Sequence, residues 1–68
     1  MAYYYVKNGG TATGDGGRYA SQQAGSFAGL GATGYYDNIQ DAIDNATTTP
    51  TSGDYILVSD LHSFTAAG

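Results

Sequence analysis

Two neighbouring segments decide the fold of this chain: Asp37-Asn38-Ile39-Gln40-Asp41-Ala42-Ile43-Asp44-Asn45-Ala46, and, after a polar gap, Gly53-Asp54-Tyr55-Ile56-Leu57-Val58. The first has apolar residues at helical spacing, and the second ends in a continuous apolar run. A short helix followed by such a run predicts a small α+β or mostly β fold with much irregular structure.

The helix is predicted over residues 37–47. Asp37 is a suitable N-cap, and Gln40 three residues later completes a capping-box pattern. The helix is too short to be stable alone, so packing of one apolar face must hold it. That predicted core face consists of Ile39, Ala42, Ile43 and Ala46.

Three strands are predicted around this helix. The aromatic and β-branched residues at 3–7 predict an N-terminal strand covered on both faces. The apolar run predicts a strand over 54–59, of the kind that is buried on both faces. A further short strand is predicted over 61–65.

Residues 8–36 are predicted to form one long glycine-rich loop. This segment holds nine of the 11 glycines. Loops of this length without regular structure are uncommon inside a compact domain. We therefore expect a functional loop, or one that a partner orders.

We interpret the 68 residues as one N-terminal segment. Its core is expected to be thin, since a chain this short buries only about 60% of the surface that its unfolded form exposes. Small domains often gain stability from disulfides or a metal, but this chain has no Cys and one His. We expect assembly with other chains, or a longer parent protein, to supply the missing stability.

The net charge of −4 arises from six Asp against Lys7 and Arg18. This balance disfavours nucleic acid, because phosphate contacts need clustered Lys and Arg. It also disfavours an anionic membrane surface. The N-terminus lacks the pattern of a signal peptide. We therefore expect synthesis in the cytoplasm, without export through an N-terminal signal.

No motif indicates catalysis, a cofactor or a metal. Gly29-Leu30-Gly31-Ala32-Thr33-Gly34 spells G-x-G-x-x-G, but no strand is predicted to run into it, as dinucleotide binding requires. The three helix carboxylates lack calcium-loop spacing and fit a solvated face better. His62 and Ser63 would point to opposite faces of a strand, which is not triad geometry.

The order of these elements resembles the N-terminal cap segment of right-handed parallel β-helix proteins of the pectate-lyase-like superfamily, which includes many phage tailspikes and fibres. The residues that carry the resemblance are Tyr5-Val6, Gly10-Thr11-Ala12-Thr13-Gly14-Asp15-Gly16, residues 39–46 and residues 53–58. The resemblance implies that the helix is a lid on the solenoid and that the Gly-Asp strand begins its first coil. Catalytic residues of that family lie on later coils, so none is carried onto this chain.

We expect a non-enzymatic virion structural protein, the N-terminal anchoring or capping part of a phage tail fibre, tailspike or capsid decoration protein. A virion protein is made in the host cytoplasm and needs no signal. One alternative is the N-terminal end of a β-helix polysaccharide lyase or hydrolase whose active site lies outside this chain. Another is a bacterial surface or matrix protein located outside the cell.

The expected partners are other virion proteins and copies of the same chain, in a homo-oligomer such as a trimer. Large aromatic and aliphatic side chains in the N-terminal strand and the glycine-rich loop are the expected contacts. These residues are Tyr3, Tyr4, Tyr5, Phe27, Leu30, Tyr35 and Tyr36.

Overall fold

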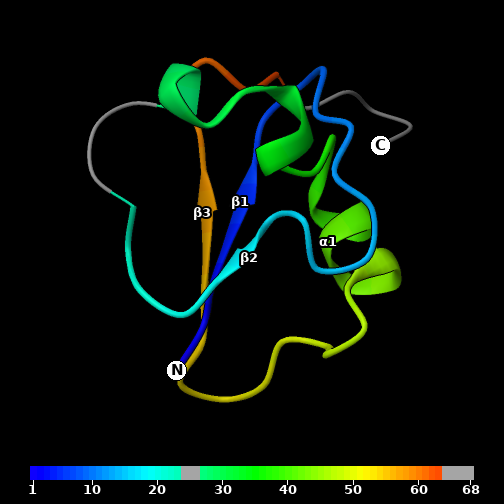
Figure 1. Ribbon diagram of the computed structural model, residues 1–68, viewed down its shortest axis with the longest axis vertical. Helices are drawn as coiled ribbons and strands as arrows, with labels where there is room; N and C mark the ends of the chain where they lie inside the picture. The colour runs from blue at the N-terminus through cyan, green and yellow to red at the C-terminus, as the bar shows by residue number, and fades with distance from the viewer. Residues whose placement is uncertain (24–26, 64–68) are drawn as a thin grey trace.

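The computed structural model describes residues 1–23 and 27–63 (Figure 1). Three strands form one mixed sheet: β1 (Tyr3–Val6), β2 (Arg18–Tyr19) and β3 (Tyr55–Val58). Between β2 and β3 lie one α-helix, α1 (Ile39–Asn45), and two 3₁₀ helices, η1 (Phe27–Leu30) and η2 (Ala32–Gly34). The prediction of a small α+β fold with one short helix is confirmed.

β1 is the central strand, in the order β2-β1-β3. β2 runs antiparallel to it, with Tyr3 opposite Tyr19. β3 runs parallel to it, from Tyr3 opposite Tyr55 to Val6 opposite Val58. Side chains of β1 on both faces of the sheet are buried, as predicted. The buried residues are Tyr4, Tyr5 and Val6.

Tyr36 continues the β2 side of the sheet beyond the end of β2. Its N–H donates to the Tyr5 carbonyl at 2.8 Å, and its carbonyl accepts from the Lys7 N–H at 2.9 Å. These two hydrogen bonds form an isolated bridge between Val6 and Tyr36. β1 itself ends at Val6, one residue before the end of the predicted strand.

The ends of β3 also differ from the prediction of 54–59. The Asp54 N–H donates to the Thr51 carbonyl at 3.0 Å, so Asp54 closes a turn before the strand. Residues 61–63 are not a strand, because the His62 N–H donates to the Ser59 carbonyl at 3.0 Å and turns the chain. Residues 64 and 65 of the predicted strand lie outside the described residues.

The segment 8–36 is more ordered than the predicted loop. It contains β2, η1 and η2, and residues 24–26 lie outside the described part. β2 has two residues, too few to produce a recognisable alternation, and it is set by pairing with β1. The prediction of one loop over this segment therefore missed β2 and the two 3₁₀ helices.

The N-cap of α1 lies one residue later than predicted, and the helix spans Ile39–Asn45 instead of 37–47. Asn38 is the N-cap, and its Oδ1 accepts from the Asp41 N–H at 2.8 Å. Asp37 instead accepts from the Gly9 N–H at 2.8 Å, and Gln40 donates to Asp44 at 3.0 Å. The predicted capping box is therefore wrong, because Asp37 bonds to the glycine-rich segment instead of to the helix.

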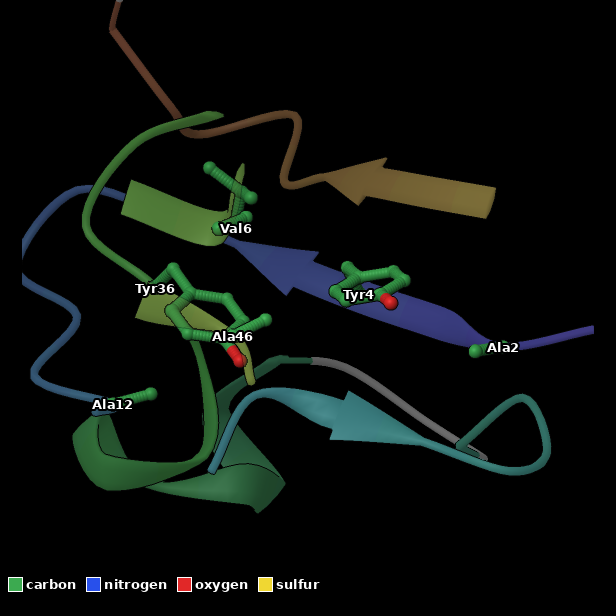
Figure 2. Packing of buried hydrophobic residues seen from close by; sticks show 7 residues of the cluster. Ala2, Tyr4, Val6, Ala12, Tyr36 and Ala46 are labelled. Atoms are coloured by element: carbon green, nitrogen blue, oxygen red, sulfur yellow. The ribbon is translucent and has the colours of Figure 1, made fainter. Parts of the chain in front are cut away.

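The core lies between α1 and the face of β1 that carries Tyr4 and Val6 (Figure 2). Its buried members include Ala42 of α1 and Ala46, the C-cap residue that follows α1, and Ile39 packs against the cluster. Ile43 is 37% exposed and lies at the margin, which corrects its predicted place on the core face. Ala42 and Ala46 lie four residues apart at the centre of the contact, and Ile43, one position after Ala42, lies about 100° further round the helix axis. The cluster comprises Ala2, Tyr4, Val6, Ala12, Tyr36, Ala42 and Ala46.

Gly10 lets the glycine-rich segment cross closely over the chain before α1. A Cβ added to Gly10 would lie 2.4 Å from the Tyr35 carbonyl oxygen and 2.6 Å from the Tyr36 carbonyl carbon. Both neighbours are backbone atoms that hydrogen bonds hold in place, including Ala12 N–H to Tyr35 O at 3.1 Å. The fold therefore needs glycine at this position for space alone.

We predict that Gly10→Ala lowers the free energy of unfolding by about 3 kcal/mol, because a methyl group must displace backbone. Gly29→Ala is the matched control, since nothing lies within 4 Å of its added Cβ. Thermal unfolding followed by circular dichroism measures both. Equal melting temperatures of the two variants would contradict the close approach at Gly10.

Candidate functional site

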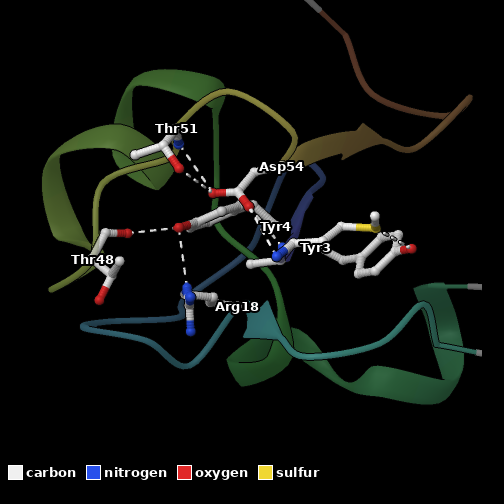
Figure 3. Close-up of polar contacts among 8 residues, drawn as sticks. Tyr3, Tyr4, Arg18, Thr48, Thr51 and Asp54 are labelled. Carbon is white, nitrogen blue, oxygen red and sulfur yellow. Dashed lines mark hydrogen bonds and ion pairs between the residues drawn. The ribbon is translucent and has the colours of Figure 1, made fainter.

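The start of β3 is tied to the start of β1 by the carboxylate of Asp54 (Figure 3). Its Oδ1 accepts from the Ala2 N–H at 2.7 Å, and its Oδ2 accepts from the Thr51 N–H at 3.0 Å. The Tyr55 N–H then donates to the Ala2 carbonyl at 2.9 Å. The hydrogen bonds from Thr51 and Ala2 lower the pKa of Asp54, so the carboxylate stays ionised and sets where β3 begins.

A second anchor holds the polar segment that leads from α1 to β3. The carboxylate of Asp15 accepts from the Thr47 N–H at 2.9 Å and also from the Thr47 hydroxyl. The hydroxyl bond is the largest cause of the lowered pKa of Asp15. The ring of Tyr4 adds a third connection, because its hydroxyl donates to the Thr48 carbonyl at 2.6 Å and accepts from Arg18 Nε at 3.1 Å (Figure 3).

The outer edge of β3 is the side that faces away from β1. On the inner side, Tyr55 donates to Ala2 and Ser59 donates to the Val6 carbonyl at 2.9 Å. In a parallel ladder the residues that bond to one neighbour alternate with those that face the other side. The N–H and C=O groups of Ile56 and Val58 therefore point outward, and no strand among the described residues pairs with them.

The side chains of this edge are apolar and partly exposed. Tyr55 is 51% exposed and Ile56 37%, while Leu57 and Val58 are half-buried. Residues 55–58 contain no charge, proline or glycine, the devices by which edge strands are usually protected. The prediction that this strand is buried on both faces is therefore wrong for the chain as described, because an apolar run does not distinguish an edge strand from a central one.

An aromatic layer covers the face of the sheet opposite α1. The Tyr5 ring meets Tyr19 at 5.3 Å and Phe27 at 5.0 Å between centroids, and Phe27 meets Tyr35 at 6.0 Å. The Lys7 ammonium lies 5.6 Å from the Tyr35 centroid. The polar groups of this layer form hydrogen bonds with the backbone. The Tyr19 hydroxyl, for example, donates to the Gly34 carbonyl at 2.7 Å. This layer fixes η1 and η2 against β1.

Tyr3 and Tyr55 form a separate pair on the same face. They are opposite each other in the β1–β3 register, with ring centroids 5.2 Å apart and planes at 14°. The pair therefore reaches from the centre of the sheet to its open edge.

The structure separates the predicted contact residues into two groups. Tyr4 and Tyr36 are fully buried, and Tyr5 and Tyr35 are nearly so, which leaves their side chains little surface for a partner. Tyr3, Phe27 and Leu30 are half-buried.

Sequence reasoning did not select Tyr55 and Ile56, the most exposed large side chains of β3. The signal that could have found them is the absence of any protecting charge within an apolar run.

No group of three or more His, Cys, Asp or Glu within residues 1–23 and 27–63 is placed to hold a metal ion. In the same ranges, no helix is long and apolar enough to cross a membrane. Comparison of the chain with protein-family models, with curated proteins and with solved structures finds no match. The function must therefore be inferred from the geometry of the molecule itself.

We predict that the fold loses stability in acid as Asp15 and Asp54 become protonated. Both have a lowered pKa in the folded chain, so their contribution is complete above the ordinary aspartate pKa of about 3.9 and is lost as the pH falls through the folded values. The double variant Asp15→Asn/Asp54→Asn should be less stable than the parent chain at neutral pH, and this difference should shrink as the pH falls below the ordinary aspartate pKa, by thermal melting. Asp60→Asn, at an exposed position, is the control. A constant difference between variant and parent at every pH would contradict this assignment.

Proposed function

We propose that this chain is a non-enzymatic structural protein of a virion, the N-terminal anchoring or capping part of a phage tail fibre, tailspike or decoration protein. In this proposal β3 begins a parallel β-helix. The observation that carries it is the asymmetry of the sheet. β1 has β2 and Tyr36 along one side and the parallel strand β3 on the other, and no strand within residues 1–23 and 27–63 pairs with the outer edge of β3.

This asymmetry suits the end of a stacked β structure. Such a stack needs one terminus that is closed against further pairing and one edge that accepts the next strand. β2 is short and carries Arg18, features that discourage pairing at its own side. β3 has neither feature, which supports growth of the sheet in one direction only.

The position of α1 supports a capping role. Parallel strands need a crossover connection, and here it carries α1 across the face of β1 that bears Tyr4 and Val6. The helix buries Ala42, and its C-cap residue Ala46, against the sheet, while Gln40 and Asp44 remain exposed to water. An element with one apolar and one polar face is what the end of a solenoid requires.

The carboxylates with lowered pKa values support a structural role. Asp15 and Asp54 each accept hydrogen bonds from threonines of the segment between α1 and β3. A general acid or base works best with a pKa near the operating pH, and these two are shifted away from it. Their chemistry is that of fixed hydrogen-bond acceptors that hold loops in place.

The proposed partners are other virion proteins and copies of the chain, with a trimer as one form of the homo-oligomer. The net charge of −4 gives nucleic acid and anionic membranes no attraction to this chain.

Immunogold electron microscopy of particles from the source culture tests the proposal. An antiserum against the purified chain should label intact particles at a fixed place, such as the base of a fibre. A serum absorbed with the purified chain is the control. Particles without label, together with polysaccharide cleavage by the native full-length product, would overturn the proposal in favour of a β-helix lyase or hydrolase.

A further inference from the structure

The stacked rings of Tyr3 and Tyr55 are two successive steps of a ladder that crosses the sheet. Residues opposite each other in a parallel pair project their side chains on the same face, one beside the next. Here that geometry brings the two rings to a centroid distance of 5.2 Å with planes at 14°. Tyr3 covers one face of the Tyr55 ring, so the other face is directed away from β1 and beyond the edge of the sheet.

The outer face of the Tyr55 ring has no stacked aromatic neighbour among the described residues. Its side chain is 51% exposed, whereas Tyr5, further along the same face of β1, is 4% exposed. Offset stacking of two rings is favourable beyond the area that it buries. A planar side chain in the next strand would therefore gain from lying against Tyr55.

The outward backbone groups set the register of that next strand. The β1–β3 pair gives the rule: Tyr55 lies opposite Tyr3, and its N–H donates to the carbonyl of the preceding residue, Ala2. By the same rule, the Ile56 N–H donates to the residue beside Tyr55 in a parallel neighbour. The Ile56 C=O accepts from the residue beside Leu57. The residue beside Tyr55 is thus fixed by its backbone as well as by its ring.

We infer that the outer edge of β3 receives a parallel strand that places an aromatic residue directly beside Tyr55 and apolar residues beside Ile56 and Val58. This rests on the proposed function, and the strand comes from the next coil of the same protein. The incoming strand continues the pairing that β1 and β3 already make. It covers the partly exposed side chains of both faces at once.

An antiparallel second copy fits this edge less well. Pairing of two β3 strands centred on Leu57 would place Asp54 opposite Asp60 of the second copy, and like charges directly opposite each other are destabilising. Pairing centred on Ile56 places Leu57 opposite Tyr55, which leaves the outer ring face without an aromatic neighbour. Pairing centred on Tyr55 would bring the two Tyr55 rings together, but it places Leu57 and Val58 opposite Gly53 and Ser52 and so leaves half of β3 without a strand partner. Among these registers, the parallel one alone extends the ladder and also pairs the whole of β3.

A strand peptide added to the purified chain tests this inference. The probe copies residues 54–59 between solubilising lysines, and its matched control has alanine in place of its tyrosine. NMR of the labelled chain should show slower exchange of the Ile56 and Val58 amides on binding. The tyrosine peptide should bind about 3- to 10-fold more tightly than the alanine peptide. Tyr55→Ala in the chain should abolish that preference, because it removes the ring against which the peptide tyrosine would stack. Tyr55 is 51% exposed, so we expect the variant chain to remain folded.

A spin label on the N-terminus of the peptide reports its direction. Parallel binding should broaden the signals of Asp54 and Tyr55, whereas antiparallel binding would broaden those of Asp60. Antiparallel binding, or equal affinity for the two peptides, overturns the inference and leaves the proposed function in place. If the exchange rates of the Ile56 and Val58 amides do not change at millimolar peptide, the inference is overturned. The open edge of β3 then no longer supports the proposed function, which the labelling of particles tests independently.

Discussion

The parallel register of β3 on β1 determines where every other part of the molecule lies. It places Tyr55 beside Tyr3, and it requires the chain to return over the sheet, which is where α1 packs. Asp54 holds this register through the Ala2 N–H at one end, and the Ser59 N–H holds it through the Val6 carbonyl at the other. Because β1 is paired on both sides, β2 and β3 form the two edges of the sheet, and the edge of β3 is the longer one. The candidate site follows from that constraint.

Tyrosine supplies most of the bulk of this small core, and its hydroxyls connect the core to the loops. The hydroxyl of the buried Tyr36 donates to the Gly14 carbonyl at 2.6 Å, and the hydroxyl of the buried Tyr4 donates to the Thr48 carbonyl at 2.6 Å. A phenylalanine would fill the same space but leave those carbonyls without this partner. The long segments 8–36 and 46–54 are thus fastened to the sheet by the residues that fill it. Glycine makes the contact possible where backbone approaches a ring, as at Gly17, whose added Cβ would lie 2.5 Å from Tyr36.

Local pattern was sufficient for the helix and for the existence of β1 and β3, because apolar spacing and β-branched content are properties of short windows. It did not separate Asp37 from Asn38 as the N-cap, since both side chains suit that position and tertiary contact with Gly9 decides. β2 exists only through its pairing with β1. The edge position of β3 depends on which strands lie beside it. The apolar run alone therefore could not predict the exposure of Tyr55 and Ile56. Tyrosine is common both in protein–protein interfaces and in cores. For this reason the sequence predicted partner contacts for Tyr4 and Tyr36, which are buried in the core.

The central claim is that β3 pairs with β1 on one side only, in the parallel register that leaves Ile56 and Val58 facing outward. Amide hydrogen exchange of the isolated chain, measured residue by residue by NMR, tests it most directly. The account predicts alternating protection along the strand, with slow exchange at Tyr55, Leu57 and Ser59 and fast exchange at Ile56 and Val58. Uniform protection from 55 to 59, or protection of the opposite residues, would contradict it.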